Sequence, residues 1–187
     1  MMTLTPQPLF RRAMGRLFHL LPDPVKHQHG VLDIQLSSGR CDIDRGRAWN
    51  ARVIAWLFGF PPAGRDLPTT VTVISEGRRE IWHRNFGGKG IFTVLEAAAR
   101  AGDPVIVERF GWGVTFDLAI REIEDGLSMS VIGMRACGLP VPRWLWPRLD
   151  ATERAERQRF LFDIDIRLGW GDALIHYRGW VTPPAAA

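Results

Sequence analysis

The feature that most constrains how this chain can fold is a regular alternation of apolar and polar side chains in several short segments. In the segment 160–168, phenylalanine, isoleucine and leucine occupy every second position, and two aspartates and an arginine fall between them. Successive side chains of a strand point to opposite faces, so this alternation indicates a strand with one apolar face. Similar segments recur from Thr69 onward, separated by short turn-forming stretches, which is typical of antiparallel hairpins.

Taken together, these signals predict about ten strands in meander order. The expected strands are 31–36, 40–45, 70–75, 79–86, 91–98, 104–110, 114–122, 127–135, 160–168 and 173–181. Ser37-Ser38-Gly39 is expected to form a hairpin turn between the first two, and Ala101-Gly102-Asp103 a turn between the fifth and sixth. A sheet of this size must curl or close, because long exposed edges invite aggregation. We therefore expect a mainly β (α+β) fold, a strongly curved antiparallel meander in the form of a half-barrel or barrel.

Three segments carry helical signals. Residues 9–21 predict a short N-terminal amphipathic helix, for which packing against the sheet or over a cavity mouth is favoured over contact with a membrane surface. Residues 47–60 form the strongest helical pattern, with an apolar stripe made of Trp49, Val53, Trp56, Leu57 and Phe60. The other side of this helix is apolar as well, so we expect it to be buried with the sheet wrapped around it. Asp150, with Glu153 three residues later, resembles a capping box and predicts a third, short helix.

Composition limits the class of protein. The 187 residues predict one antiparallel-sheet domain over 8–182, with flexible ends at 1–7 and 183–187. The net charge of +4 comes from scattered arginines without a basic stripe, so no nucleic-acid partner is expected. The chain shows no secretory signal and no apolar run of the roughly 20 residues that a membrane span needs, so a cytoplasmic protein is expected. Cys41 and Cys137 lack metal-site spacing and are expected to be two buried thiols.

Two predicted strands carry a charged residue on an apolar or aromatic face. Arg84 lies between two aromatic residues in 79–86, and Glu108 lies on the apolar face of 104–110. An isolated buried charge is very costly, so Arg84 and Glu108 are expected to pair inside the curved sheet. The pair is either a bridge that orders the core or a binding site, in which Arg84 holds an anionic headgroup or a substrate carboxylate and Glu108 orients it.

The aromatic content favours a ligand cavity around this pair. Eight Trp and ten Phe accompany a single Tyr, and broad apolar rings fill large cores and also line apolar cavities. The first hypothesis is a non-catalytic binder of a small, largely apolar or amphipathic molecule with an anionic end. The residues expected to bind it are Trp82, His83, Arg84, Phe86, Glu108, Phe110, Tyr177 and Trp180.

The second hypothesis is an enzyme that uses the same cavity for acid–base chemistry. Glu108 or Asp163 is then the proton carrier, assisted by His83 or His27. Nucleophilic catalysis has no support, because the chain lacks a GxSxG elbow. The sequence therefore leaves open whether the protein is an enzyme, and it singles out no catalytic residue.

A metal or cofactor site is not expected. His27 and His29 have the spacing of a metal-binding pair on a strand, but nothing in the sequence singles out a third ligand among Glu108, His83 and His176. The glycine-containing stretches lack the strand–loop–helix context of a phosphate-binding loop. We therefore predict neither a metal nor a cofactor.

A set of local motifs spans nearly the whole chain. They are Leu21-Pro22 with His27, Arg45-Gly46, Pro61-Pro62-Ala63-Gly64, Trp82-x-Arg84-x-Phe86-Gly87-Gly88, Glu108-Arg109-Phe110-Gly111, Leu139-Pro140, Phe160-x-Phe162-Asp163 and Tyr177-x-Gly179-Trp180. In these motifs the chain resembles the bacterial domain-of-unknown-function family DUF4166. That family has no assigned reaction and occurs alone or fused behind saccharopine-dehydrogenase-like or short-chain-dehydrogenase-like domains. The resemblance implies a third hypothesis, an interaction module for a dehydrogenase-like partner.

Overall fold

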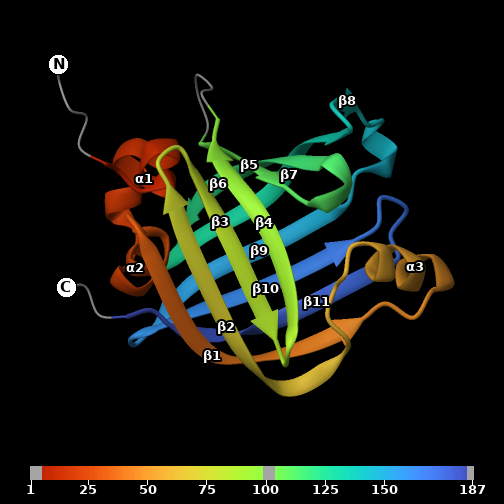
Figure 1. The fold of residues 1–187 in the computed structure, drawn as a ribbon, viewed down its shortest axis with the longest axis horizontal. Coiled ribbons are helices and arrows are strands. Elements are labelled where there is room, and N and C mark those ends of the chain that lie inside the picture. Colours follow the sequence, from red (N-terminus) through yellow and green to blue (C-terminus); the bar gives the residue numbers. More distant parts are fainter. Residues whose placement is uncertain (1–5, 99–103, 185–187) are drawn as a thin grey trace.

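Ten antiparallel strands close into a barrel in the computed structural model, which describes residues 6–98 and 104–184 (Figure 1). The strands are β1 (Ile34–Arg45), β2 (Gly64–Glu76), β3 (Arg79–Phe86), β4 (Lys89–Ala97), β5 (Val105–Arg109), β6 (Val114–Ile123), β7 (Gly126–Ala136), β9 (Arg148–Glu156), β10 (Arg159–Arg167) and β11 (Ala173–Thr182). β1 to β7 pair in sequence order, and the pairs β7–β9, β9–β10, β10–β11 and β11–β1 complete the circle. The predicted mainly antiparallel fold is confirmed, and the sheet closes fully.

The hairpin predicted at Ser37-Ser38-Gly39 is wrong. These residues lie inside β1, which runs without a turn and pairs with β2 on one side and β11 on the other. The backbones approach so closely here that a Cβ atom on Gly39 would lie 1.9 Å from the carbonyl oxygen of Trp180. Glycine in a strand can mark a close approach of another backbone as well as a turn, and here it marks the approach.

The helix predicted from Asp150 is also wrong, because this segment forms β9. β9 pairs with β10 along its whole length and with the first residues of β7. Backbone pairing on both sides outweighs the local preference for a helix cap, since tertiary context overrides intrinsic propensity. Glu153 consequently lies on a buried strand face and not at a helix start.

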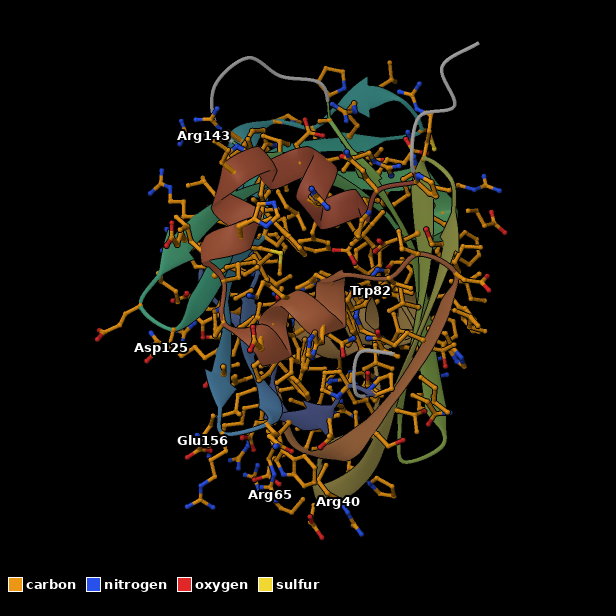
Figure 2. All side chains as sticks on the ribbon, turned by 90° about the vertical axis from the view of Figure 1, so that its left-hand side faces the viewer. Arg40, Arg65, Trp82, Asp125, Arg143 and Glu156 are labelled. Atoms are coloured by element: carbon orange, nitrogen blue, oxygen red, sulfur yellow. The ribbon has the colours of Figure 1, made fainter. Side chains whose placement is uncertain are left out.

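Helical segments cover one end of the barrel, as Figure 2 shows from that side. They are α1 (Leu9–Met14), the 3₁₀ helix η1 (Gly15–Leu20) and α2 (Asp23–His29). Leu9, Phe10 and Val25 are completely or almost completely buried. The helix predicted over 9–21 is therefore present in two parts, and its apolar side packs against the barrel. None of the described helices is long and apolar enough to cross a membrane.

The helix predicted at 47–60 forms α3 (Trp49–Leu57), but the sheet does not wrap around it. It lies at the end of the barrel opposite α1 and α2 (Figure 1). Ala51 and Ala55 are its buried residues, whereas Trp49 and Trp56 are largely exposed. The expectation of a buried helix is therefore wrong, because only one of its two apolar sides is covered.

Arg45 and Gly46 explain how α3 is held at this position. The Arg45 guanidinium donates hydrogen bonds to the carbonyl oxygens of Phe60 and Pro61, at 3.2 and 2.6 Å, and so fixes the chain that follows the helix. Gly46 lies against β11, where a Cβ atom would be 1.8 Å from the carbonyl oxygen of Ala173. The Arg45-Gly46 motif therefore holds the chain in place both before and after α3.

The remaining predictions concern the two cysteines, one turn and the ends of the chain. Cys41 is buried as expected, but Cys137 is exposed in a turn with a positive φ of 50°, so the prediction of two buried thiols is half wrong. The turn predicted at 101–103 lies outside the described residues. The same holds for most of the ends predicted to be flexible, 1–7 and 183–187.

Candidate functional site: a polar cluster in the barrel cavity

A cavity of about 510 Å³ occupies the interior of the barrel and has a mostly apolar wall. At one end it is closed by Phe10, Gln28 and His29, which are almost completely buried. At the other end its wall includes Leu145 and Trp170, which are exposed to solvent. The cavity therefore opens at the α3 end of the barrel. Its volume lies within the range of about 300–1,000 Å³ that is usual for small-molecule pockets.

Six of the eight residues predicted to bind a ligand line this cavity. They are Trp82, Arg84, Phe86, Glu108, Phe110 and Tyr177. His83 points to the outside of β3 and stacks on Phe92, with ring centroids 3.9 Å apart. Trp180 lies on the outside of β11, where the Arg159 guanidinium is 4.0 Å from its ring centroid. His83 and Trp180 are therefore not part of the cavity, because the strand alternation that turns their neighbours inward turns them outward.

Arg84 is held in the cavity by three neighbours. Its Nη1 donates a hydrogen bond of 2.8 Å to Thr93 Oγ1 and a longer one of 3.4 Å to Glu108 Oε1. Its guanidinium carbon lies 4.9 Å from the ring centroid of Trp82. The predicted pairing of Arg84 with Glu108 is confirmed, but the contact is long and uses one nitrogen. The other guanidinium nitrogens make no hydrogen bond to any described residue, and a guanidinium carries five N–H donors.

Tyr177, the only tyrosine of the chain, borders the cavity close to this pair. Its ring centroid is 5.5 Å from that of Phe86 and 6.1 Å from that of Phe162. Burial raises the pKa of Tyr177 to about 12, with the nearby Arg84 charge lowering it and Glu108 raising it. Its hydroxyl group makes no hydrogen bond within the described part of the chain, so it remains a neutral donor for anything that enters the cavity.

We expect the phenol of Tyr177 to titrate about two pH units above an ordinary tyrosine, because burial disfavours the phenolate. Since there is one tyrosine, the ultraviolet absorbance change of phenolate formation reports this residue alone. The folded-state pKa is raised, so the contribution of Tyr177 to stability is complete below pH 10 and is lost as the pH rises toward 12. A midpoint near pH 10 in the folded protein, with unfolding monitored by circular dichroism, would contradict this burial.

A second polar pair lies at the closed end of the cavity and was not predicted. His29 Nε2 and Glu153 Oε2 are 2.6 Å apart, and both side chains are buried. The His29 ring stacks on Phe10, with centroids 3.6 Å apart, and its Nδ1 has no hydrogen-bond partner among the described residues. The sequence did contain a signal for Glu153, because Leu149, Ala151 and Glu153 alternate with polar residues. This is the same pattern that identified Glu108.

Glu80 connects the helices at the closed end to the barrel wall. Its carboxylate accepts hydrogen bonds from the backbone N–H of Leu9 at 3.2 Å and from Trp82 Nε1 at 2.9 Å. Burial raises the pKa of Glu80, and these hydrogen bonds partly oppose the shift. The side chain is fully buried and bonded to both elements, so its role is structural.

The residues proposed for acid–base chemistry do not come together. Asp163 pairs with His176 on the outside of the barrel, at 2.7 Å. His27 lies on α2 and, like His83, does not line the cavity. Glu108 is therefore the only member of that set with access to the cavity. In the described residues, no group of three His, Cys, Asp or Glu side chains is placed to hold a metal ion.

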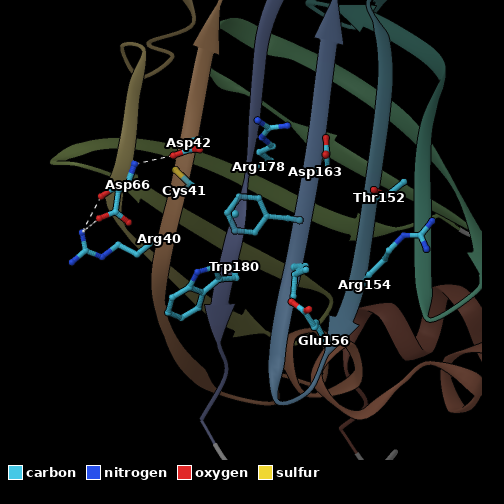
Figure 3. Close-up of a pocket in the computed structure, with 13 residues that line it drawn as sticks. Arg40, Cys41, Asp42, Asp66, Thr152, Arg154, Glu156, Asp163, Arg178 and Trp180 are labelled. Carbon is cyan, nitrogen blue, oxygen red and sulfur yellow. Dashed lines mark hydrogen bonds and ion pairs between the residues drawn. The ribbon is translucent and has the colours of Figure 1, made fainter.

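A shallower groove of about 520 Å³ crosses the outside of β1, β11, β10 and β9 (Figure 3). Three of its polar residues bond to one another: Arg40 Nη1 lies 3.0 Å from Asp66 Oδ2, and the Asp66 backbone N–H donates to Asp42 Oδ1 at 2.8 Å. Trp180 and Arg178 are among the other residues that line it. The groove is open and carries charges of both signs, so it lacks the enclosed apolar wall that distinguishes the barrel cavity.

Comparison with known proteins gives a family and no activity. No curated protein and no solved structure matches the chain significantly. The model of one family, described as a domain of unknown function, matches residues 21–181, a range that begins after α1 and contains every strand of the barrel up to Val181 in β11. The resemblance found in the motifs is thus confirmed, and the chain belongs to the DUF4166 family.

Proposed function

We propose that the barrel is a non-catalytic binder, a carrier or sensor, of a small and largely apolar molecule with one anionic end. The observation that carries this proposal is Arg84, a charged residue inside an apolar cavity. Among the described residues its only ionic partner is Glu108, 3.4 Å away. Ligand sites typically combine an apolar wall with a few placed polar groups. The apolar part of the ligand contacts the aromatic wall, and its anionic end meets the spare donors of Arg84.

The hydrogen-bond donors at Arg84 and Tyr177 favour a ligand whose polar end is anionic. Arginine binds carboxylate or phosphate with two parallel N–H donors, and such charge-assisted bonds are the strong ones. The Tyr177 hydroxyl, neutral below its raised pKa of about 12, is a further donor beside it. Binding of an acid also offsets the cost of holding a loosely paired charge away from water.

An enzyme is the weaker proposal. Of the four residues that the acid–base alternative uses, only Glu108 borders the cavity, and catalysis by proton transfer needs its partners within hydrogen-bond reach of the reacting atoms. For the third hypothesis, an interaction module for a dehydrogenase-like partner, no residue that lines the cavity provides support.

The proposal is tested on freshly purified full-length protein by native mass spectrometry, followed by organic extraction of any bound molecule. We expect a stoichiometric amphipathic adduct that carries an acidic group. The second measurement uses dansyl-labelled undecanoic acid and its methyl ester as fluorescent probes on extracted protein. The acid is expected to bind at least about tenfold more tightly, because hydrogen bonds to charged groups contribute about 1.5–3 kcal/mol.

Two results would overturn the proposal. One is an extracted protein that binds neither probe, which would leave the cavity without a ligand function. The other is equal affinity for the acid and the ester, which would remove the anionic end from the proposal and leave an apolar pocket.

A further inference from the structure

Helix α3 presents an unpartnered apolar face to solvent at the opening of the cavity. Trp49, Val53, Trp56 and Leu57 lie on this face and are 78%, 53%, 80% and 45% exposed. The opposite side of the same helix is used inside the protein, where Ile54 lines the cavity. A contiguous exposed apolar patch on a protein is typical of an interaction site.

Three further exposed tryptophans lie in the other segments at this end of the barrel. Trp112 is in the 3₁₀ helix η2 (Gly111–Gly113), Trp144 is in η3 (Arg143–Leu145) and Trp170 is in the β10–β11 turn. Trp49, Trp56, Trp112, Trp144 and Trp170, which we call the aromatic rim, are between 51% and 80% exposed. The other three of the eight tryptophans, Trp82, Trp146 and Trp180, are buried or half-buried. Exposed tryptophan is thus confined to the end where the cavity opens.

Contacts between these segments show that the rim is one surface. Phe58 of the α3 segment lies against Phe110, next to η2, with ring centroids 6.4 Å apart. Asp172 in the β10–β11 turn accepts hydrogen bonds from Asn50 Nδ2 in α3 at 3.0 Å and from Trp170 Nε1 at 2.9 Å. The same turn abuts η3, since a Cβ atom on Gly169 would lie 2.3 Å from the carbonyl oxygen of Trp144.

The segments that carry the aromatic rim have a net positive charge. Segments 46–60, 110–113, 137–148 and 168–172 contain four arginines and one aspartate, a net charge of +3. The arginines are Arg47, Arg52, Arg143 and Arg148, all exposed, and none forms an ion pair with a described residue. The single aspartate, Asp172, is already bonded to Asn50 and Trp170. The surface around the opening therefore fits a partner with a negative surface and an apolar interior.

We propose that the aromatic rim docks on an anionic lipid bilayer, with the cavity opening toward the membrane. Tryptophan prefers the boundary between headgroups and acyl chains, and arginine is attracted to anionic headgroups. Docking in this orientation joins the apolar wall of the cavity to the acyl chains, so an amphipathic molecule passes between them without crossing water. A protein partner seated on the rim would block the opening, whereas a bilayer places acyl chains there. A bilayer therefore fits the arrangement better.

The test measures co-sedimentation of the full-length, ligand-extracted protein with vesicles, so it does not depend on what the cavity binds. Vesicles of phosphatidylcholine are compared with vesicles of phosphatidylcholine and phosphatidylglycerol in equal parts. We expect binding to the anionic vesicles that weakens as salt is added. The Trp49→Ala/Trp56→Ala variant is expected to lose on the order of tenfold or more in partitioning, and Arg47→Gln/Arg52→Gln about fivefold for each arginine at low salt.

The matched control is Ile34→Thr/Leu36→Thr, which removes two apolar residues that are 63% and 59% exposed near the start of β1, away from the opening. It is expected to bind vesicles as the unmodified protein does. Failure to bind any vesicle would overturn the proposal, as would equal losses in the control and the tryptophan variant. A stable dimer or protein complex that the tryptophan variant abolishes, without vesicle binding, would assign the rim to a protein partner instead.

Discussion

Replacement of Arg84 by leucine is expected to weaken binding of dansyl-labelled undecanoic acid by on the order of a hundredfold and to leave binding of the methyl ester nearly unchanged. Truncating one partner of a buried charged hydrogen bond costs about 2–5 kcal/mol, and the ester lacks the charge that Arg84 would meet. Fluorescence titration of both probes against the same protein preparation measures this difference directly. The informative quantity is the ratio of the dissociation constants of the acid and the ester, because a general effect of the substitution on the cavity changes both constants equally.

Two further variants separate an anionic site from a structural bridge. Arg84→Leu alone leaves Glu108 unpaired in the cavity, and an unpaired buried charge can destabilise the fold. Arg84→Leu/Glu108→Leu removes both charges, so it is expected to fold and to bind acid and ester equally. His83→Leu changes the neighbouring residue, which points to the outside, and is expected to bind as the unmodified protein does. A double variant that still prefers the acid would show that Arg84 and Glu108 only order the core.

Replacement of Gly39 by alanine is expected to destabilise the protein by on the order of 3–5 kcal/mol, a large value for a single methyl group. The added Cβ atom would lie 1.9 Å from the carbonyl oxygen of Trp180 and 2.8 Å from the Cα atom of Val181, and both are backbone atoms. β1 and β11 must then separate at the pairing that closes the barrel. Urea unfolding followed by circular dichroism measures the loss.

Gly77→Ala is the matched control for this experiment. Gly77 lies in the turn between β2 and β3 with a φ of +65°, and no atom lies within 4 Å of an added Cβ. The substitution costs only the left-handed conformation, about 1–2 kcal/mol. If Gly39→Ala were no more destabilising than Gly77→Ala, then Gly39 would behave as a turn residue and the pairing of β1 with β11 would be wrong there.

The sequence determined most of the strands and the inward direction of the key charged residues. A side-chain period of two follows from strand geometry alone, so the alternation in β3 and β10, and Glu108 on the apolar face of β5, could be read without knowing what the strands contact. The same rule also turns His83 and Trp180 outward. The alternation alone could therefore have placed these two predicted site residues outside the cavity.

Only the tertiary structure decided how the strands meet and what covers each apolar surface. Ser37-Ser38-Gly39 has the composition of a turn, and Asp150 with Glu153 that of a helix cap, yet both segments are strands because neighbours distant in sequence pair with them. The pattern at 47–60 states that two sides of a helix are apolar, but not that one faces a cavity and the other solvent. The period of the apolar residues indicates which side chains are buried. It does not indicate what they pack against, because that depends on contacts between segments far apart in the chain.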